Sequence, residues 1–319
     1  MYGDWERGMV GMFHKGLFIL AHQCGDTSFY PAYKRLIRNQ WKPYAELKRE
    51  QEKQLRLTIE FSYENVPYYH NLFKSLGLSP LDVRTIEDLE RLPILTKDII
   101  KKHWEDFKPK NLSSMKYYNR ATGGSTGTPL QYRLSKRDRF LSGALLYRGW
   151  GYGGYELGDR MAFLGGSSLG IGAKFDLTKK VHEIARNIRK LSSFDMGDPE
   201  LREYARILNS FRPHFTMGYA SSIYFFARWL EENKVSVPSQ KGIFTTAEKL
   251  FPQMRKTIGD IFCCDVYDTY GLNDGGISAY ECSEHAGLHI DTERSILEVV
   301  DNEGLQIDCG EGQILATSL

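Results

Sequence analysis

The second half of the chain alternates short apolar runs with longer amphipathic stretches. The apolar runs 161–164, 213–217, 241–246 and 264–270 predict strands, and the stretches 199–210, 221–233 and 251–262 have helical spacing. Strands that alternate with helices in this rhythm predict a mostly parallel sheet with helices on both faces. Ligands of such sheets bind outside the carboxyl ends of the strands. The pattern therefore predicts an α/β fold with its binding site at those ends.

The first half reads mostly as helices. Residues 1–40 are mixed and aromatic-rich, and they predict a peripheral helical arm. Apolar residues on one face predict a helix from Tyr44 to about residue 63, ended by the proline at 67. Thr85 and Thr96 each precede a short stretch with acid in its first turn, and both are predicted to be helix N-caps. Residues 115–118 and 130–134 predict strands, and Ser135 is predicted to cap a helix over 136–150.

Composition excludes several classes of protein but does not identify a function. The 319 residues carry a net charge of +2, which argues against a nucleic-acid-binding surface. The five cysteines are too few for a disulfide framework, and the adjacent Cys263 and Cys264 are predicted to be reduced and buried. No apolar run approaches the roughly 20 residues that a membrane span needs, and no signal-peptide cleavage site follows the N-terminal runs. We expect a cytoplasmic protein with no membrane span.

The most distinctive segment lies between the two predicted strands of the first half. It contains Thr122, Gly123, Gly124, Ser125, Thr126, Gly127, Thr128 and Pro129. Consecutive backbone N–H groups with nearby hydroxyls can form a concave nest for phosphate oxygens. The segment lacks the Gly-Lys-Ser/Thr of a Walker A loop, and the alternative is a hairpin turn rich in glycine and hydroxyl residues. A second glycine-rich run, 165–172, is interpreted as a mobile loop over a substrate pocket.

Two further polar segments follow predicted strands. One contains Thr246, Ala247 and Glu248, and the other contains Asp268, Thr269, Tyr270, Gly271 and Asp274. Both can be ordinary polar turns, with Glu248 favoured by the dipole of the helix that follows it. Because all these segments lie at predicted strand ends, we expect them to converge.

Three of the segments together resemble a known family. Residues 122–129 resemble the Ser/Thr-Ser/Gly-Gly-Thr/Ser-Thr-Gly-x-Pro loop of the adenylate-forming (AMP-binding) superfamily. Residues 246–248 resemble its Gly-Ala/Gly-Glu segment, and residues 270–274 resemble its Tyr-Gly-x-Ser/Thr-Glu segment. The sequence is most similar to the branch of phenylacetate–CoA ligases and capsule-biosynthesis adenylate synthetases. The resemblance runs from about residue 65 to 319, which implies an N-terminal helical arm over 1–64 and the large N-terminal domain of the adenylate-forming fold over 65–319.

The resemblance also implies a reaction and roles. It implies ATP, Mg²⁺, CoA as co-substrate and a small carboxylic acid, with Asp274 and Thr126 as catalytic residues. Residues 122–127, 246–248 and 268–271 would bind the nucleotide, and Asp274 would hold Mg²⁺ where the family has glutamate. The family's ribose-gripping aspartate and its small C-terminal domain follow the point where this sequence ends, so we expect ATP or AMP binding with weak or absent turnover for the chain alone. The alternative is a degenerate nucleotide-binding protein acting in polysaccharide biosynthesis with a partner, either a second copy or a separate C-terminal subunit.

One more cluster suggests a metal. Cys282, His285 and His289, with Cys309 as a fourth ligand, have residue types that suit a structural Zn²⁺ site. The alternative is a hairpin in which the histidine binds no metal.

Overall fold

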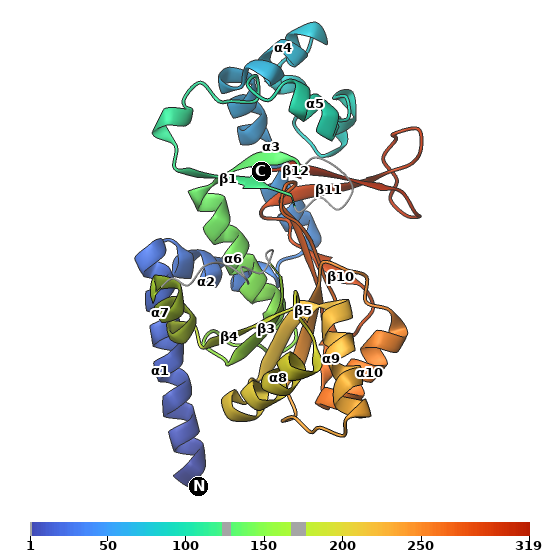
Figure 1. Ribbon diagram of the computed structural model, residues 1–319. Helices are drawn as coiled ribbons and strands as arrows, with labels where there is room; N and C mark the ends of the chain where they lie inside the picture. Colours follow the sequence, from blue (N-terminus) through green and yellow to red (C-terminus); the bar gives the residue numbers. More distant parts are fainter. Residues whose placement is uncertain (1, 123–128, 167–176) are drawn as a thin grey trace. The chain divides into compact units, whose positions relative to one another are not determined.

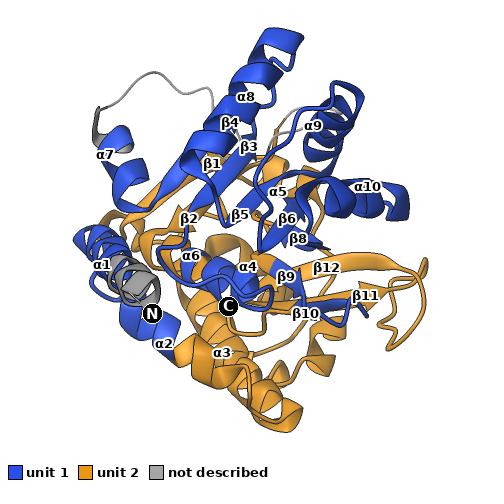
Figure 2. Cartoon of the chain, turned by 90° about the horizontal axis from the view of Figure 1, so that it is seen from below, with its two compact units in different colours: residues 1–34, 143–271, 278–289 blue, residues 35–142, 272–277, 290–319 orange. Residues whose placement is uncertain are grey.

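A computed structural model of the chain describes residues 2–122, 129–166 and 177–319 (Figure 1). The chain forms two compact units, coloured separately in Figure 2. Unit 1 contains residues 1–34, 143–271 and 278–289, and unit 2 contains residues 35–142, 272–277 and 290–319. The division predicted at residues 64 and 65 stays a prediction.

Unit 1 is built on a parallel sheet. Its strands lie in the order β4-β3-β5-β6-β7 and are β3 (Met161–Gly165), β4 (Ile188–Ser192), β5 (Phe215–Tyr219), β6 (Gly242–Thr246) and β7 (Asp265–Tyr267). Parallel neighbours put all the carboxyl ends at one edge. The predicted α/β fold class is confirmed.

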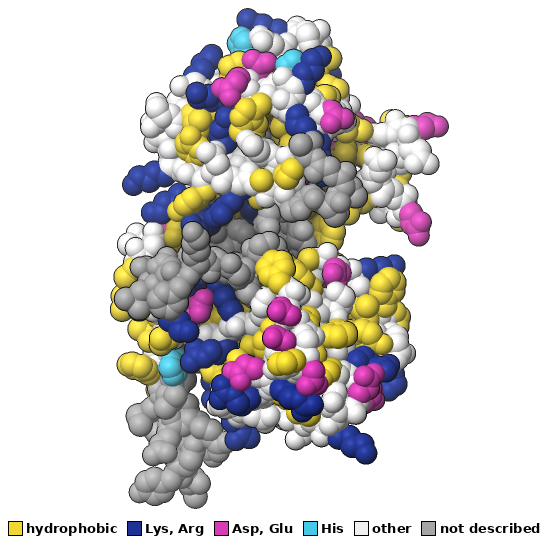
Figure 3. All heavy atoms as spheres, viewed as in Figure 1, with side chains coloured by type: hydrophobic (Ala, Val, Ile, Leu, Met, Phe, Trp, Pro, Cys, Tyr) yellow, Lys and Arg dark blue, Asp and Glu magenta, His cyan; other side chains and the backbone are white. Residues whose placement is uncertain are grey.

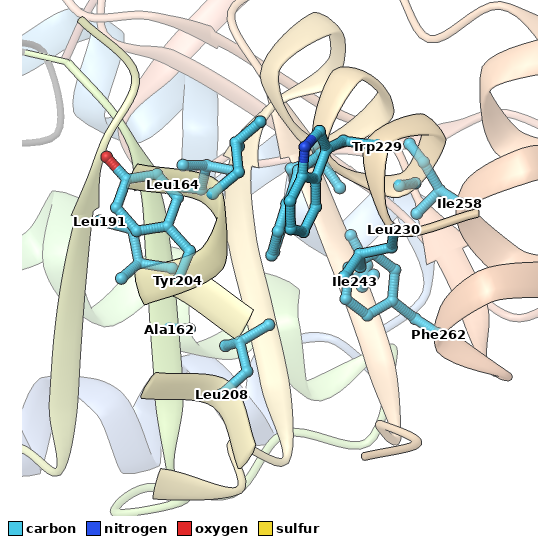
Figure 4. Packing of buried hydrophobic residues seen from close by; sticks show 14 of the residues in the cluster. Ala162, Leu164, Leu191, Tyr204, Leu208, Trp229, Leu230, Ile243, Ile258 and Phe262 are labelled. Atoms are coloured by element: carbon cyan, nitrogen blue, oxygen red, sulfur yellow. The ribbon is translucent and has the colours of Figure 1, made fainter. Parts of the chain in front are cut away.

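Helices cover both faces of this sheet, which explains why its strands are apolar throughout. One face packs on α8 (Asp198–Phe211), α9 (Ala220–Glu232) and α10 (Pro252–Phe262). Figure 4 shows this core, in which side chains of β3, β4 and β6 meet those of the three helices. On the other face Trp150 stacks on Phe244, with ring centroids 5.7 Å apart. Each fully buried large side chain contributes about 1.5–3 kcal/mol, so the sheet is a rigid base for whatever lies at its edge.

Unit 1 also contains α1 (Tyr2–Gly25), α7 (Leu177–Ala185) and most of a sheet of order β10-β9-β8, formed by β8 (Thr269–Leu272), β9 (Ile277–Glu281) and β10 (Leu288–Ile290). His22 anchors α1, because its ring stacks between Phe18 and Phe29 at 4.4 Å from each. Its Nε2 lies 3.1 Å from the Tyr147 hydroxyl. Burial, aided by the charge of Arg186, lowers the pKa of His22 to about 4.

Unit 2 combines helices with two small antiparallel sheets. The helices are α3 (Tyr44–Asn65), α4 (Pro67–Ser75) and α5 (Lys97–Lys102), with short 3₁₀ helices at Pro80–Asp82, Glu87–Arg91 and Leu112–Ser114. One sheet pairs β1 (Tyr117–Ala121) with β2 (Gln131–Ser135), and the other pairs β11 (Ser295–Val300) with β12 (Gln313–Ser318). Two helices, α2 (Phe29–Asn39) and α6 (Lys136–Gly151), contain residues of both units.

Several sequence predictions are confirmed at the level of single residues. The helix α3 begins at Tyr44. Thr96 caps α5, since its Oγ1 accepts a hydrogen bond of 3.3 Å from the Ile99 N–H. Ser135 caps α6 by accepting from the Asp138 N–H at 3.0 Å.

Three predictions are wrong. Thr85 is not an N-cap: its N–H donates to Asp88 Oδ2 at 2.9 Å, and the element that follows is a 3₁₀ helix. Residues 264–270 do not form one strand, because Asp268 separates β7 from β8. Cys263 is exposed rather than buried, because it ends α10 in a left-handed conformation with φ +51°. Within the described ranges no helix is both long enough and apolar enough to cross a membrane.

Candidate functional site

The carboxyl edge of the parallel sheet in unit 1 collects polar side chains. Tyr219 ends β5 beside Thr246, which ends β6. The buried Thr245 hydroxyl donates to Asp268 Oδ1 at 3.1 Å, and the Thr269 hydroxyl donates to the Thr245 carbonyl at 2.6 Å. These hydrogen bonds cross from β6 to the start of β8, and they bring Thr245, the neighbour of the predicted Thr246, together with Asp268 and Thr269 in unit 1.

Asp268 is held in place by its surroundings. Its Oδ1 also accepts from the Thr269 N–H at 2.9 Å, while its own N–H donates to Glu281 Oε2 at 2.7 Å. Burial raises the pKa of Asp268, and the hydrogen bonds from Thr245 and Thr269 oppose that rise. The Asp268 carboxylate is thus held as a hydrogen-bond acceptor for Thr245 and Thr269 at the carboxyl end of the sheet.

An ion pair between the buried Glu281 and the partly exposed Arg255 supports this turn from β9. Arg255 of α10 donates through Nη2 to both carboxylate oxygens of Glu281, at 2.9 and 3.0 Å. Its Nη1 donates to the Val266 carbonyl and lies 3.0 Å from His285 Nδ1. Because the Glu281 side chain is only 6% exposed, the arginine neutralises a charge that water cannot reach.

Ala247 and Glu248 turn the chain away from β6. Ala247 has φ +67°, a left-handed conformation that costs free energy for a residue with a Cβ and is common at functional sites. Glu248 accepts from the Ser221 N–H at 2.8 Å, in the first turn of α9. The glutamate therefore caps the helix that precedes it in the chain, not the helix after it as the turn interpretation assumed.

Aromatic side chains also lie in this part of unit 1, and the sequence analysis missed two of them, Phe194 and Tyr219. A Cβ on Gly166, just after β3, would lie 3.0 Å from Phe194 Cζ and 3.4 Å from the Tyr219 hydroxyl. Phe194 is 67% exposed, which is unusual for so large an apolar ring. Tyr270 exposes 37% of its surface, and Gly271 has open space where a Cβ would lie. Exposed rings at an edge with polar anchors can hold a flat ligand such as a purine.

Unit 2 carries the other predicted residues. Thr122 closes the hairpin of β1 and β2, because its N–H donates to the Leu130 carbonyl at 3.0 Å and its Oγ1 accepts from the Leu130 N–H at 3.0 Å. Gly123, Gly124, Ser125, Thr126 and Gly127 lie outside the described residues. The predicted mobile loop at 165–172 also lies mostly outside them, since residues 167–176 are not described.

Asp274 sits on a turn that β12 fixes. A Cβ on Gly275 would lie 2.4 Å from the Ala316 Cβ, and the Ser318 hydroxyl donates to the Gly275 carbonyl at 3.1 Å. Burial, and next the negative charge of Asp274, raise the pKa of Tyr132 on β2. Asp274 therefore acts electrostatically on β2, the strand that follows the glycine-rich segment. One carboxylate with room for water and phosphate oxygens suits Mg²⁺, which seldom has an all-protein cage.

The predicted zinc ligands do not assemble. Among residues 2–122, 129–166 and 177–319, no group of three His, Cys, Asp or Glu side chains could hold a metal ion. His285 faces Arg255 and Glu281, and the ring of His289 packs edge-on against Tyr152 at 5.3 Å. Zn²⁺ at Cys282, His285, His289 and Cys309 is therefore unsupported.

Two curated proteins resemble this chain in sequence. No protein-family model matches the chain. Protein CapK of Staphylococcus aureus is 28% identical over 217 residues, which cover 66% of this chain and 47% of CapK. Phenylacetate-coenzyme A ligase of Escherichia coli K12 is 25% identical over 288 residues, which cover 86% of this chain and 63% of the ligase. The chain thus spans roughly half to two thirds of these relatives.

Solved structures agree on the fold. A 2-hydroxyisobutyryl-CoA ligase in complex with 2-HIB-AMP and CoA matches 86% of this chain and 62% of its own, with a TM-score of 0.67 and 17% identity. The same ligase in its postadenylation state gives a TM-score of 0.68. At this identity the likeness shows the fold alone.

Proposed function

Because this chain is a homologue of phenylacetate–coenzyme A ligases and of CapK, with the fold of acyl-CoA ligases of the adenylate-forming superfamily, we propose that it activates a carboxylic acid with ATP. The acid would become an acyl-adenylate and then a thioester of CoA. The observation that carries the proposal is the edge of unit 1, where Thr245, Asp268 and Thr269 hold the ends of β6 and β8 together beside exposed aromatic rings.

The edge of unit 1 suits the nucleoside and the acyl group. Thr246, Ala247 and Glu248 leave β6 in a fixed turn, so their backbone groups can contact a base without paying for ordering. Tyr270 offers an exposed ring to stack on adenine, and Gly271 leaves space above the backbone. Asp268 holds the start of β8 in place by accepting hydrogen bonds from the Thr245 hydroxyl and the Thr269 N–H.

Unit 2 suits the phosphates. Thr122 holds the base of the glycine-rich segment, whose residues 123–127 would supply N–H and hydroxyl donors, with Thr126 at the reacting phosphate. Asp274 would hold Mg²⁺, which when bound offsets the charge of the phosphate oxygens. No lysine lies within residues 122–129.

The proposed chemistry balances without a redox partner. A carboxylate oxygen of the acid attacks the α-phosphorus, the bond from that phosphorus to the bridging oxygen breaks, and pyrophosphate leaves. A thiolate then attacks the acyl carbon, and AMP leaves with the electron pair of the acyl–oxygen bond. Donors of the chain would hold the reacting groups in position and stabilise the charge that moves onto pyrophosphate.

A second candidate is a nucleotide-binding protein without turnover that acts with a partner in polysaccharide biosynthesis. The similarity to CapK favours it.

Exchange of radiolabelled pyrophosphate into ATP, with a panel of aromatic and aliphatic acids, tests the proposal. Slow exchange that depends on an acid and is lost in Asp274→Ala supports the enzyme. ATP binding with no exchange for any acid supports the second candidate, and the absence of ATP binding contradicts both.

A further inference from the structure

The two faces of the β1–β2 hairpin in unit 2 differ in what they carry. Arg120 pairs across the strands with Tyr132, and Tyr118 pairs with Leu134, so these side chains share one face. Arg133 pairs with Asn119 and lies on the opposite face, where its guanidinium sits 4.0 Å from the Trp104 ring. Burial first, and then the negative charge of Asp274, raise the pKa of Tyr132, so Asp274 acts electrostatically on a residue of the face that carries Arg120.

Two guanidiniums lie close to one aromatic ring of this face. Arg120 lies over the Tyr118 ring at 5.6 Å, and Arg139 from α6 lies over the same ring at 4.7 Å. Within the part of the chain that the structure describes, neither forms an ion pair with a carboxylate. Two positive charges held at the same ring repel each other, and a bound anion close to both would offset that cost.

The start of α6 adds positive charge to the same place. Lys136, Arg137 and Arg139 lie in its first turn, where the helix dipole already favours anions. The one acid there, Asp138, is taken by Arg294, whose Nε and Nη2 donate to its two oxygens at 2.8 and 2.9 Å. In Figure 3, Lys and Arg side chains gather where Figure 1 draws β1 and the start of α6.

We propose that Arg120 and Arg139 form a pyrophosphate subsite, which binds the β- and γ-phosphates of ATP and the pyrophosphate that leaves. Arg120 lies two residues before Thr122, at the base of a segment that has no lysine of its own. Guanidinium groups bind phosphate through two parallel hydrogen bonds, and the Tyr118 ring holds both groups in orientation. Asp274 then remains available for the cation. The inference rests on the proposed function, since ATP is the source of the pyrophosphate.

Calorimetric titration of inorganic pyrophosphate, ATP and AMP into the 319-residue chain tests the subsite, at fixed Mg²⁺ and ionic strength. Arg120→Gln and Arg139→Gln should each weaken pyrophosphate and ATP binding by about tenfold or more, because each loses a charge-assisted contact. AMP affinity should change less than about twofold, since AMP has neither distal phosphate. Arg120→Lys should keep part of the affinity. Arg133→Gln is the matched control, an arginine of the same hairpin stacked on an aromatic ring but on the other face.

The outcomes separate this inference from the function on which it rests. Pyrophosphate binding without ATP binding by the unmodified chain would refute the proposed function and leave the subsite standing, provided that the variants weaken it. Unchanged pyrophosphate and ATP affinities in both glutamine variants would overturn the subsite alone. Equal loss of ATP and AMP affinity, or an equal effect of Arg133→Gln, would also overturn it, and an unmodified chain that binds neither ligand would overturn both.

Discussion

Replacing Arg255 by methionine removes the positive charge behind the candidate site with little change in side-chain volume. Glu281 would keep the Asp268 N–H at 2.7 Å but lose both hydrogen bonds from the guanidinium. The carboxylate, 6% exposed, then keeps only the Asp268 N–H and the His285 ring, whose Nδ1 lies 3.3 Å from Glu281 Oε2, and the loss of the guanidinium costs about 3 kcal/mol. The turn at Asp268 would loosen at the same time, so ATP binding should weaken along with stability.

Urea unfolding of Arg255→Met, Glu281→Gln and the double variant measures that cost. The double variant should lose less unfolding free energy than the two single variants lose together, because without the negative charge of Glu281 the positive charge of Arg255 no longer stabilises the fold. Arg206→Met is the matched control. Its pair with Glu203 has two hydrogen bonds of 2.6 Å but is largely exposed, so no measurable loss is expected. Equal effects of Arg255→Met and Arg206→Met would refute the reasoning that burial decides the magnitude.

Three further predictions concern other parts of the molecule. His22 has a lowered pKa in the folded chain, so below its ordinary pKa of 6.5 the unfolded chain binds a proton that the folded chain does not. The free energy of unfolding, measured with urea, should therefore fall by about 2–3 kcal/mol as the pH drops from 7.5 to 4.5. The same fall in a His22→Phe variant would contradict this. Glu248→Ala should cost about 1 kcal/mol by uncapping α9 at Ser221, and an unchanged melting temperature would count against the cap. Iodoacetamide should modify the exposed Cys263 quickly, while Cys264, whose pKa burial raises to about 12, should react only on unfolding, as peptide mass spectrometry would reveal.

The sequence predicted the parallel sheet because each strand is buried on both faces and therefore apolar along its whole length. It predicted the ends of β6 and β8 as a candidate site because polar residues follow those apolar runs. It could not show the break at Asp268, because the Glu281 carboxylate that takes the Asp268 N–H lies 13 residues further along the chain. The cap that Glu248 places on α9 is a tertiary contact of the same kind.

Residues that act through space rather than through a local pattern were missed. Phe194 follows a strand, β4, that was not predicted, and nothing local marks its ring as a neighbour of Gly166. Arg120 and Arg139 belong to different elements, and only the register of β1 with β2 and the start of α6 put both beside Tyr118. The zinc prediction failed for the converse reason, because suitable spacing along the chain does not bring side chains together.

Hydrogen–deuterium exchange with and without Mg²⁺-ATP tests the central claim most directly. The account predicts slower exchange in peptides that contain residues 245–248, 268–271 and 273–276 when the nucleotide binds, with little change in the helices α8 and α10. Binding of ATP that protects none of these three segments, or that protects only segments elsewhere, would contradict the account.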